Sequence, residues 1–234
     1  MSNPIGLNAG AAGKPRTVHK QRRAELTREN IISSAAKVFD SIGYAATSIN
    51  EIISVSNSTK GALYFHFPAK SDIARQLVEG WESAVLSLEQ RAANTDATPL
   101  GRLAMISRAH AELVATNTQH RAGLRLSTEP ELDAAAGIYT EWERRLEMLI
   151  KEAVEAGEVR DTATTRRFAS LYCATLIGLV HAAAARRIDK APFETQVEDL
   201  LSGWLVGILT DASRLNGLGF LTHRLPSESE TVAI

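Results

Sequence analysis

Apolar residues recur every three or four positions along most of the chain, which is the spacing that places them on one face of an α-helix. Residues 27–42 show it first, with a stripe formed by Ile31, Ala35, Val38, Phe39 and Ile42. Thr27 is placed to cap this helix at its N-terminus. No stretch alternates strictly enough between apolar and polar residues to predict a β-strand. The pattern therefore predicts an all-α protein.

Two short helices are predicted after the first. Gly43 ends the first helix in a left-handed conformation, and Ser48 with Glu51 forms a capping box that opens a helix of about 48–54. A tight turn at Asn57 separates it from a third helix, 58–64. Two short helices joined by a tight turn are typical of a helix-turn-helix domain, here residues 21–70.

The remaining residues predict longer helices separated by Pro99, Pro130 and Pro192. Their expected ranges are about 70–92, 99–116, 122–127, 134–156, 162–187 and 193–215. Residues 71–216 would form a ligand-binding and dimerisation domain. We expect residues 1–20 to be a disordered basic arm and 217–234 to be a flexible tail.

The last two helices are apolar on nearly every side, from Ser170 to Ala185 and again within 197–209. A helix without a polar face must be covered all round. A two-fold homodimer that pairs the helices 162–187 and 193–215 in a four-helix bundle would cover them. A deeply buried helix in a monomer is the alternative.

Charge divides the chain unevenly. Residues 1–75 carry ten Lys and Arg against five Asp and Glu, whereas the remainder carries 16 against 22. A basic N-terminal region on an acidic body suggests a polyanionic partner for that region alone. Ordinary surface charge remains the alternative.

Other classes of protein have little support in the sequence. Cys173 is the only cysteine, so a disulfide framework and a cysteine-rich metal site are excluded. No signal peptide or bilayer-length apolar run is found, and we expect a cytoplasmic protein without membrane contact. No phosphate loop, nucleophile elbow or metal-ligand spacing indicates an enzyme, and no cofactor is expected. A zinc site assembled in space from His110, His120 and His181 is an open alternative.

With these residues set out, the chain resembles the tetracycline-repressor-type (TetR) transcriptional regulators. The matching residues within about 22–70 are Gly43-Tyr44, Ser48-Ile49, Glu51-Ile52, Thr59-Lys60-Gly61, Leu63-Tyr64, His66-Phe67 and Lys70. Ile53 and Ser58 depart from this pattern. Further along, Ala122 to Glu129, Tyr139, Trp142, Ala153 and Gly157-Glu158 resemble the γ-butyrolactone autoregulator receptors of actinobacteria, which share this layout with relatives that sense butenolides or furans.

The resemblance implies that the third helix enters the major groove of operator DNA. Short polar side chains and a lysine suit that role, so Thr59 and Lys60 are the candidates for base-edge contact. The predicted phosphate contacts are Tyr64, His66, Lys70 and the helix N-terminus at Ser48, with Arg22 and Arg23 reaching a minor groove or nearby phosphates. Packing is the alternative for Tyr64 and His66, and solvation for the two arginines.

The ligand-binding candidates lie further along the chain. Trp142 is the first choice, as a flat wall with one N–H donor. Trp81 stands where the resemblance leads us to expect a glutamine, and Ile177 where a ligand-bonding threonine is expected, with Thr175 nearby. The other candidates are His110, Leu124, Leu126 and Thr128, followed by Tyr172 and His181. Plain hydrophobic core is the alternative for most of them.

Taken together, the sequence predicts a repressor that binds a near-palindromic operator as a dimer. A small hydrophobic signalling molecule of γ-butyrolactone or butenolide type would release it by shifting the population of conformers, with the helix from Lys70 to Trp81 as the lever. A regulator of the same fold that senses an antibiotic, an acyl-CoA or no lactone is the alternative.

Overall fold

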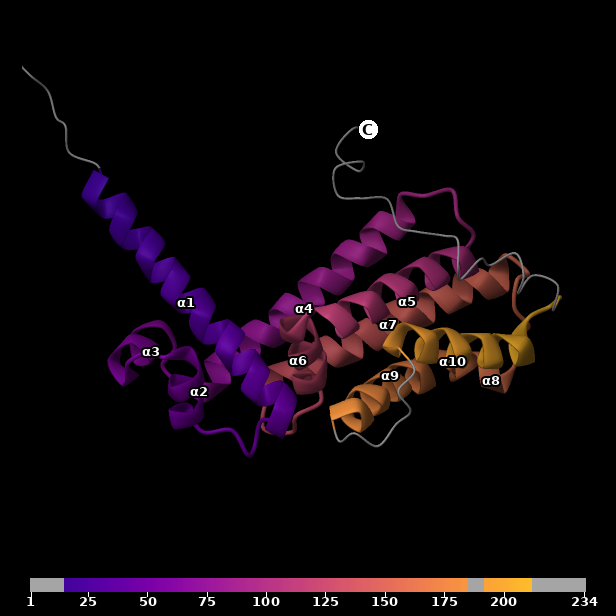
Figure 1. Cartoon of the computed structure of the whole chain (residues 1–234). Coiled ribbons are helices and arrows are strands. Elements are labelled where there is room, and N and C mark those ends of the chain that lie inside the picture. The colour runs from indigo at the N-terminus through magenta and orange to yellow at the C-terminus, as the bar shows by residue number, and fades with distance from the viewer. Residues whose placement is uncertain (1–14, 185–191, 212–234) are drawn as a thin grey trace, which may run out of the picture.

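The computed structural model describes residues 15–184 and 192–211, and these form ten α-helices (Figure 1). The helices are α1 (Pro15–Ile42), α2 (Ile49–Ser56), α3 (Lys60–His66), α4 (Lys70–Ala93), α5 (Pro99–Thr116), α6 (Thr118–Leu126), α7 (Asp133–Glu155), α8 (Ala163–Arg166), α9 (Phe168–Ala184) and α10 (Phe193–Ile208). Among the described residues, β-structure is limited to one isolated bridge between Val159 and Leu209. The all-α prediction is therefore confirmed.

Helix α1 is longer than the sequence predicted. It starts at Pro15, a residue whose fixed φ suits a first helical turn, and its first turns project from the body of the molecule (Figure 1). Thr27 does not cap it but lies inside it, where its hydroxyl donates to the carbonyl of Arg23. The predicted disordered arm is therefore wrong for residues 15–20, and residues 1–14 lie outside the described part.

The helix-turn-helix has the local signals that the sequence indicated. Glu51 N donates to Ser48 Oγ over 3.2 Å, and the Glu51 carboxylate accepts from Ser48 N over 2.6 Å, which completes the capping box. Asn57 adopts a φ of 49° between α2 and α3, and Gly43 a φ of 83° after α1. Both are left-handed conformations that Gly and Asn tolerate best.

A small apolar core holds these three helices together. Ile31, Ala35 and Phe39 of α1 pack against Ile52 of α2 and Leu63 of α3, and all five are fully buried. Because each helix presents only one apolar face to this core, the opposite face of α3 is free to project its side chains outward.

The body of the molecule follows the predicted helices closely, with three differences. Helix α6 begins earlier, at Thr118, because the Asn117 side chain caps it by accepting from two backbone N–H groups. The predicted helix 162–187 is divided into α8 and α9 at Arg167, and its last residues lie outside the described part. Helix α10 ends at Ile208, not at 215, since Thr210 bonds back to Gly157 and Glu158.

Helix α6 ties the body to the N-terminal helices. Its Gly123 lies so close to α4 that a Cβ there would meet Leu77 O at 2.4 Å. On its other side, Arg121 donates to both carboxylate oxygens of Asp40 at the end of α1, at 2.8 to 3.1 Å. A change in the position of α6 therefore acts on α1 and α4 together.

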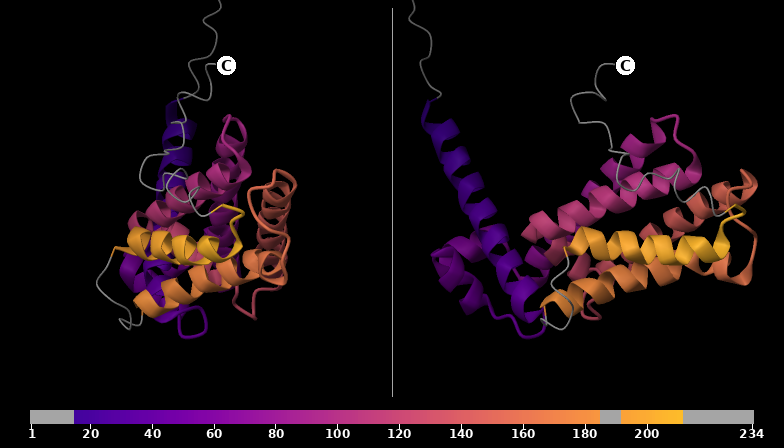
Figure 2. Two further views of the ribbon diagram at one scale, coloured as in Figure 1. Left: turned by 90° about the vertical axis from the view of Figure 1, so that its right-hand side faces the viewer. Right: turned by 45° about the vertical axis from the view of Figure 1, so that its right-hand side comes forward.

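The long helices α4, α5, α7, α9 and α10 run side by side, with α1, α2 and α3 at one end (Figure 2). Within the described residues, no helix is long and apolar enough to cross a membrane. The arrangement separates the two regions that the sequence indicated. The exposed face of α3 lies at one end, and the helical body with its interior lies at the other.

Candidate DNA-binding surface and ligand cavity

Helix α3 presents its N-terminus and one long face to solvent. Thr59 caps the helix by accepting from Ala62 N over 3.1 Å, and Lys60 follows it in an exposed position. Tyr64 is 43% exposed, so this side chain is not packed in the core, which was the alternative to phosphate contact. Its hydroxyl is free to approach an anion.

Phe65 is an exposed residue that the sequence reasoning did not select. It follows Tyr64 and is 80% exposed, the largest fraction among the exposed large apolar side chains that the structure describes. The signal was available, since Leu63 and Phe67 turn toward the core and residue 65 falls on the opposite side of a short helix. An exposed aromatic ring on this helix can contact thymine methyl groups or sugars in a groove.

Lys70 and His66, two of the predicted phosphate contacts, do not extend into solvent as that role requires. The ammonium of Lys70 donates to the carbonyls of Tyr44 and Thr47 at 2.8 and 2.9 Å and lies 4.1 Å from the centre of the Tyr44 ring. In the structure, Lys70 therefore stabilises the loop between α1 and α2. His66 is half-buried, with its ring edge-on to Phe65 at 5.0 Å.

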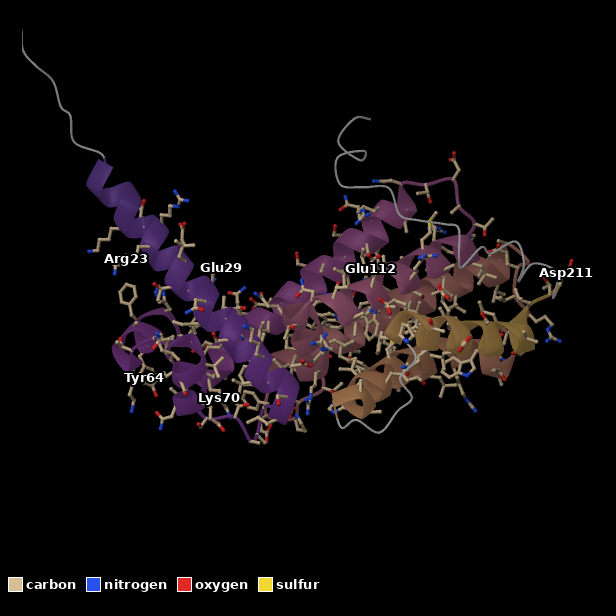
Figure 3. The ribbon with its side chains drawn as sticks, viewed as in Figure 1. Arg23, Glu29, Tyr64, Lys70, Glu112 and Asp211 are labelled. Atoms are coloured by element: carbon tan, nitrogen blue, oxygen red, sulfur yellow. The ribbon has the colours of Figure 1, made fainter. Side chains whose placement is uncertain are left out.

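The remaining DNA candidates surround α3. Ser48 is exposed at the N-terminus of α2, where backbone N–H groups are available to an anion. Arg22 and Arg23 are exposed on the projecting part of α1. Figure 3 shows Arg23 and Tyr64 at the same end of the molecule, opposite the end where Asp211 lies. Together with the exposed face of α3, these side chains form a surface with hydrogen-bond donors, cations and the aromatic rings of Tyr64 and Phe65.

A cavity of about 350 Å³ lies in the helical body between α4, α5, α7 and α9. Its wall is mostly apolar, with several charged and hydroxyl side chains. The lining residues are Glu89, Ala93, Arg102, Leu103, Ile106, Ser107, His110, Trp142, Arg144, Arg145, Leu146, Met148, Leu149, Glu152 and Tyr172. An apolar cavity of this size with a few polar groups is typical of a small-molecule site.

Trp142 and His110 form one end of this cavity and connect it to α4. The Trp142 ring lies edge-on to His110 at 5.6 Å and to Trp81 at 5.3 Å. The Trp81 indole N–H donates to His110 Nε2 over 3.2 Å, which indicates a neutral His110 with its proton on Nδ1. Trp81 therefore stands behind the cavity wall, and its N–H has a partner within the protein.

Burial controls the charge of the histidines at this end. It lowers the pKa of His110 well below its usual range, and the nearby His120 lowers it further. Burial also lowers the pKa of His120 to about 4. Because desolvation disfavours the charged form, both imidazoles are neutral at pH 7.

The other predicted ligand residues lie away from the wall of this cavity. Leu124 and Leu126 are buried in the core on α6, and Ile177 packs in the core on α9. Thr128 is exposed after α6, and its hydroxyl donates to Arg125 O. The Thr175 hydroxyl donates to Leu171 O within its own helix at 2.7 Å.

Most polar residues on the cavity wall had not been selected from the sequence. Among them, Ser107 and Arg102 come from α5 and Arg145 from α7, whereas Tyr172 of α9 had been a second-rank candidate. No local motif marks them, because a serine or an arginine on an amphipathic helix looks the same in sequence whether it faces water or a cavity. Their position is decided by how three helices pack.

The zinc alternative has no support among the residues that the structure describes. No group of three or more His, Cys, Asp or Glu side chains is arranged to hold a metal ion there. His110 and His120 lie with their ring centres 5.0 Å apart, but His181 is exposed on α9. The Trp81 indole already occupies His110 Nε2.

An N-terminal helix-turn-helix joined to a C-terminal helical body is the architecture of a DNA-binding transcriptional regulator. The family model for "Bacterial regulatory proteins, tetR family" matches residues 31–77, and the model for "Tetracyclin repressor-like, C-terminal domain" matches residues 125–196. The chain belongs to the TetR family of bacterial transcriptional regulators, whose members are not enzymes.

Two related proteins, one of them in two solved structures, can be compared with this chain in more detail. The A-factor receptor protein of Streptomyces griseus is 33% identical over 172 residues, which are 73% of this chain and 60% of that relative's length. CprB of Streptomyces coelicolor A3(2) is 30% identical, with a TM-score of 0.67 over 84% of this chain and 96% of CprB. CprB in complex with its biological operator gives a TM-score of 0.71 at 28% identity, over 84% and 94% of the chains.

A crystal structure described as a gamma-butyrolactone receptor, an ArpA-like protein, is 27% identical with a TM-score of 0.65, over 85% of this chain and 95% of the other. These similarities agree with the resemblance seen in the sequence. They support DNA binding most directly, because the family model covers the helix-turn-helix itself.

Proposed function

We propose that this protein is a ligand-responsive transcriptional repressor of the cytoplasm that binds a near-palindromic operator as a homodimer. In this proposal, a small hydrophobic signalling molecule of γ-butyrolactone or butenolide type binds in the cavity beside Trp142 and releases the DNA. The observation that carries the proposal is the pairing of an exposed recognition helix with an apolar cavity connected to α4.

The DNA-binding part of the proposal rests on α3 and its surroundings. Thr59, Lys60, Tyr64 and Phe65 lie on one exposed face, and Lys60 and the helix N-terminus attract phosphate. The solved CprB complex with an operator has the same fold. We propose that this face enters the major groove, with Arg22, Arg23 and Ser48 on the flanking backbone.

The homodimer would form through α9 and α10. Leu171 of α9 and Val206 of α10 are 47% and 56% exposed. Gly178, Gly203 and Gly207 are also exposed, with open space where a Cβ would be. Large apolar side chains beside glycines allow helices of a second subunit to approach closely, and a two-fold axis would place two α3 helices on successive half-sites.

The ligand-binding part rests on the cavity and on its connection to the N-terminal helices. Trp142 contacts His110 and Trp81, and Trp81 belongs to α4. Helix α4 packs on α6, and α6 holds Asp40 of α1 through Arg121. A ligand that favours a shifted position of α4 and α6 would lower operator affinity by its differential affinity for the two states.

Selection from a random DNA library tests the first half of the proposal. The expected product is an inverted repeat that the purified protein binds in gel shifts, with affinity that falls steeply as salt rises. Failure to enrich any sequence, together with no specific shift on the DNA upstream of its own gene, would contradict the proposal.

Replacement of Trp142 tests the second half. In Trp142→Ala, we expect operator affinity to stay within a few-fold of the wild type while release by an extract fraction containing the ligand is lost, because the cavity loses its flat wall. Leu86→Ala, an exposed truncation on α4 outside the cavity wall, is the control. Normal release from a well-folded Trp142→Ala protein would exclude this cavity.

A second candidate function is a regulator of the same fold that senses a different hydrophobic molecule, such as an antibiotic or an acyl-CoA. Trp81 and Ile177 favour it, because these two positions carry apolar residues buried in the core where lactone receptors were expected to have polar ones. Mass spectrometry of small molecules retained by the purified protein distinguishes the two candidates.

A further inference from the structure

The cavity beside Trp142 carries an unusual set of polar atoms. Ser107 Oγ, Tyr172 Oη, Arg102 Nε and Arg145 Nη2 line it or belong to residues that do, and they make no hydrogen bond within residues 15–184 and 192–211. Ser107 and Tyr172 are only 1% and 3% exposed. Buried polar groups nearly always have partners, and each one that lacks a partner needs a specific explanation.

The spare hydrogen-bonding capacity of this wall lies with donors. Guanidinium nitrogens only donate, and hydroxyl groups can donate. The carboxylates on the same wall each already accept from a guanidinium, since Glu89 accepts from Arg145 Nε at 2.7 Å and Glu152 pairs with Arg102. Because every unpartnered atom on this wall can donate, a molecule that brings acceptors would complete it.

The two hydroxyls act as a pair between α5 and α9. The Ser107 hydroxyl is close enough to offset part of the rise that burial causes in the pKa of the Tyr172 phenol. The two groups do not reach hydrogen-bond geometry with each other. Because the phenol keeps its proton at neutral pH, both hydroxyls are available to donate to one group placed between the helices.

We infer that Ser107 and Tyr172 are the polar anchors of this cavity, and that its ligand carries a carbonyl-type head with at least two acceptor oxygens. That head is a lactone ring or a carboxylate, and it is joined to an apolar tail that lies against Trp142. Arg102 and Arg145 supply further donors on the same wall. This inference rests on the proposed function of the same cavity.

The anchors occupy different positions from those expected by resemblance. Residues 81 and 177 were the expected positions, but the Trp81 N–H is bonded to His110 and Ile177 is apolar. The hydroxyls at 107 and 172 provide the missing polarity from α5 and α9. Both oxygens are closed off from water, so a ligand head reaches them only as α5 and α9 move apart, which links binding to helix movement.

Three probes with similar tails and different heads test the inference. γ-Decalactone carries a lactone, decanoic acid carries a carboxylate, and hexylcyclopentane has the shape of the lactone without oxygen. Binding to the purified protein is measured by tryptophan fluorescence and by the shift in Tm. We expect at least one oxygen-bearing probe to bind more tightly than hexylcyclopentane, and the tighter of the two identifies the head.

Ser107→Ala and Tyr172→Phe remove the hydroxyls with little change of shape. We expect each to weaken the preferred oxygen-bearing probe about tenfold and to leave hexylcyclopentane unchanged. Thr175→Val is the matched control, because its hydroxyl on α9 is bonded within the helix. Ser107→Ala and Tyr172→Phe should keep or raise the Tm, since each deletes a buried hydroxyl that has no hydrogen-bond partner.

Three results would overturn the inference: no preference of the wild type for an oxygen-bearing probe, unchanged probe affinity in both variants, or a lower Tm that reveals a structural role for the hydroxyls. Operator binding separates this inference from the proposed function. Ligand release that persists undiminished in both variants contradicts the anchors alone. A different result separates the two ideas in the other direction. If probe binding depends on the two hydroxyls but natural ligands retained by the protein do not release the operator, the anchors are supported and the proposed function is contradicted.

Discussion

At the scale of single residues, the direction of a side chain separates roles that the sequence leaves together. Tyr64, Phe65, His66 and Phe67 are consecutive aromatic residues, yet Phe67 is buried, His66 is half-buried, and the first two are exposed. Lys60 and Lys70 are both basic, but only Lys60 points to solvent. We therefore propose the DNA-binding role for the exposed members of each set only.

Phe65→Ala should weaken operator binding without weakening the fold. An 80% exposed ring contributes little to stability, so the free energy of unfolding should change by less than about 0.5 kcal/mol. If the ring contacts bases or sugars, operator affinity should fall roughly tenfold, a loss of about 1.4 kcal/mol, as measured by fluorescence anisotropy. Leu86→Ala, an exposed apolar truncation on α4, is the control. Equal operator affinities for the two variants would remove Phe65 from the interface.

His120 should make the protein sensitive to mild acid. Its pKa is lowered from 6.5 to about 4 by burial, so the unfolded chain binds the proton more readily than the folded protein in this range. The stabilisation is complete above pH 6.5 and is lost as the pH falls toward 4, by up to about 1.4 kcal/mol per pH unit. Urea unfolding of His120→Gln should show a shallower slope between pH 6.5 and 5. Parallel curves for the variant and the wild type would exclude this residue as a source.

At the scale of elements, the signals that begin and end helices were readable in the sequence because they are local. A capping box, a left-handed asparagine and a proline in a first turn each involve residues a few positions apart, and all of them recur in the structure. The starts of α1 and α6 were misplaced although their signals, Pro15 and the Asn117 cap, are local as well. Packing had no such local signal, because the close approach of α6 to α4 and its bond to Asp40 join residues 46 and 81 positions apart.

Gly123→Ala should destabilise the protein by forcing α6 away from α4. The new Cβ would lie 2.4 Å from Leu77 O and 2.6 Å from Trp81 Cβ, and backbone cannot yield as a flexible side chain does. We expect a loss of about 1–3 kcal/mol in the free energy of unfolding, measured with urea. Gly80→Ala on α4 is the matched control, because a Cβ there has no atom within 4 Å and should be neutral or stabilising. Similar stabilities for the two variants would refute the close packing of α6 on α4.

At the scale of the whole molecule, the proposed operator-binding surface and the proposed ligand cavity lie at separate places joined by α4 and α6. The proposed dimer would add the geometry that an inverted repeat requires, since one α3 helix contacts one half-site. Helices α9 and α10 would set the distance between the two α3 helices. Dimerisation and operator binding should then be lost together.

Val206→Arg should convert the dimer to a monomer. Val206 is 56% exposed on α10 beside the open positions of Gly203 and Gly207, so a charge there is tolerated by the monomer and excluded from an apolar interface. Light scattering after size exclusion should show half the wild-type mass, with an unchanged helical spectrum and operator affinity reduced more than tenfold. Leu86→Arg on α4 is the control. A wild-type mass for Val206→Arg would place the interface elsewhere.

The sequence by itself determined the helical class, the helix-turn-helix and the family, because periodicity, caps and turns are properties of neighbouring residues. It also selected Trp142 and His110, which lie on the cavity wall. Only the tertiary structure decided that Trp81 is bonded behind that wall, that Lys70 holds a loop, and that the hydroxyls of Ser107 and Tyr172 are buried without partners beside the cavity. Such roles depend on which helix packs opposite a side chain, and residues distant in the chain settle that.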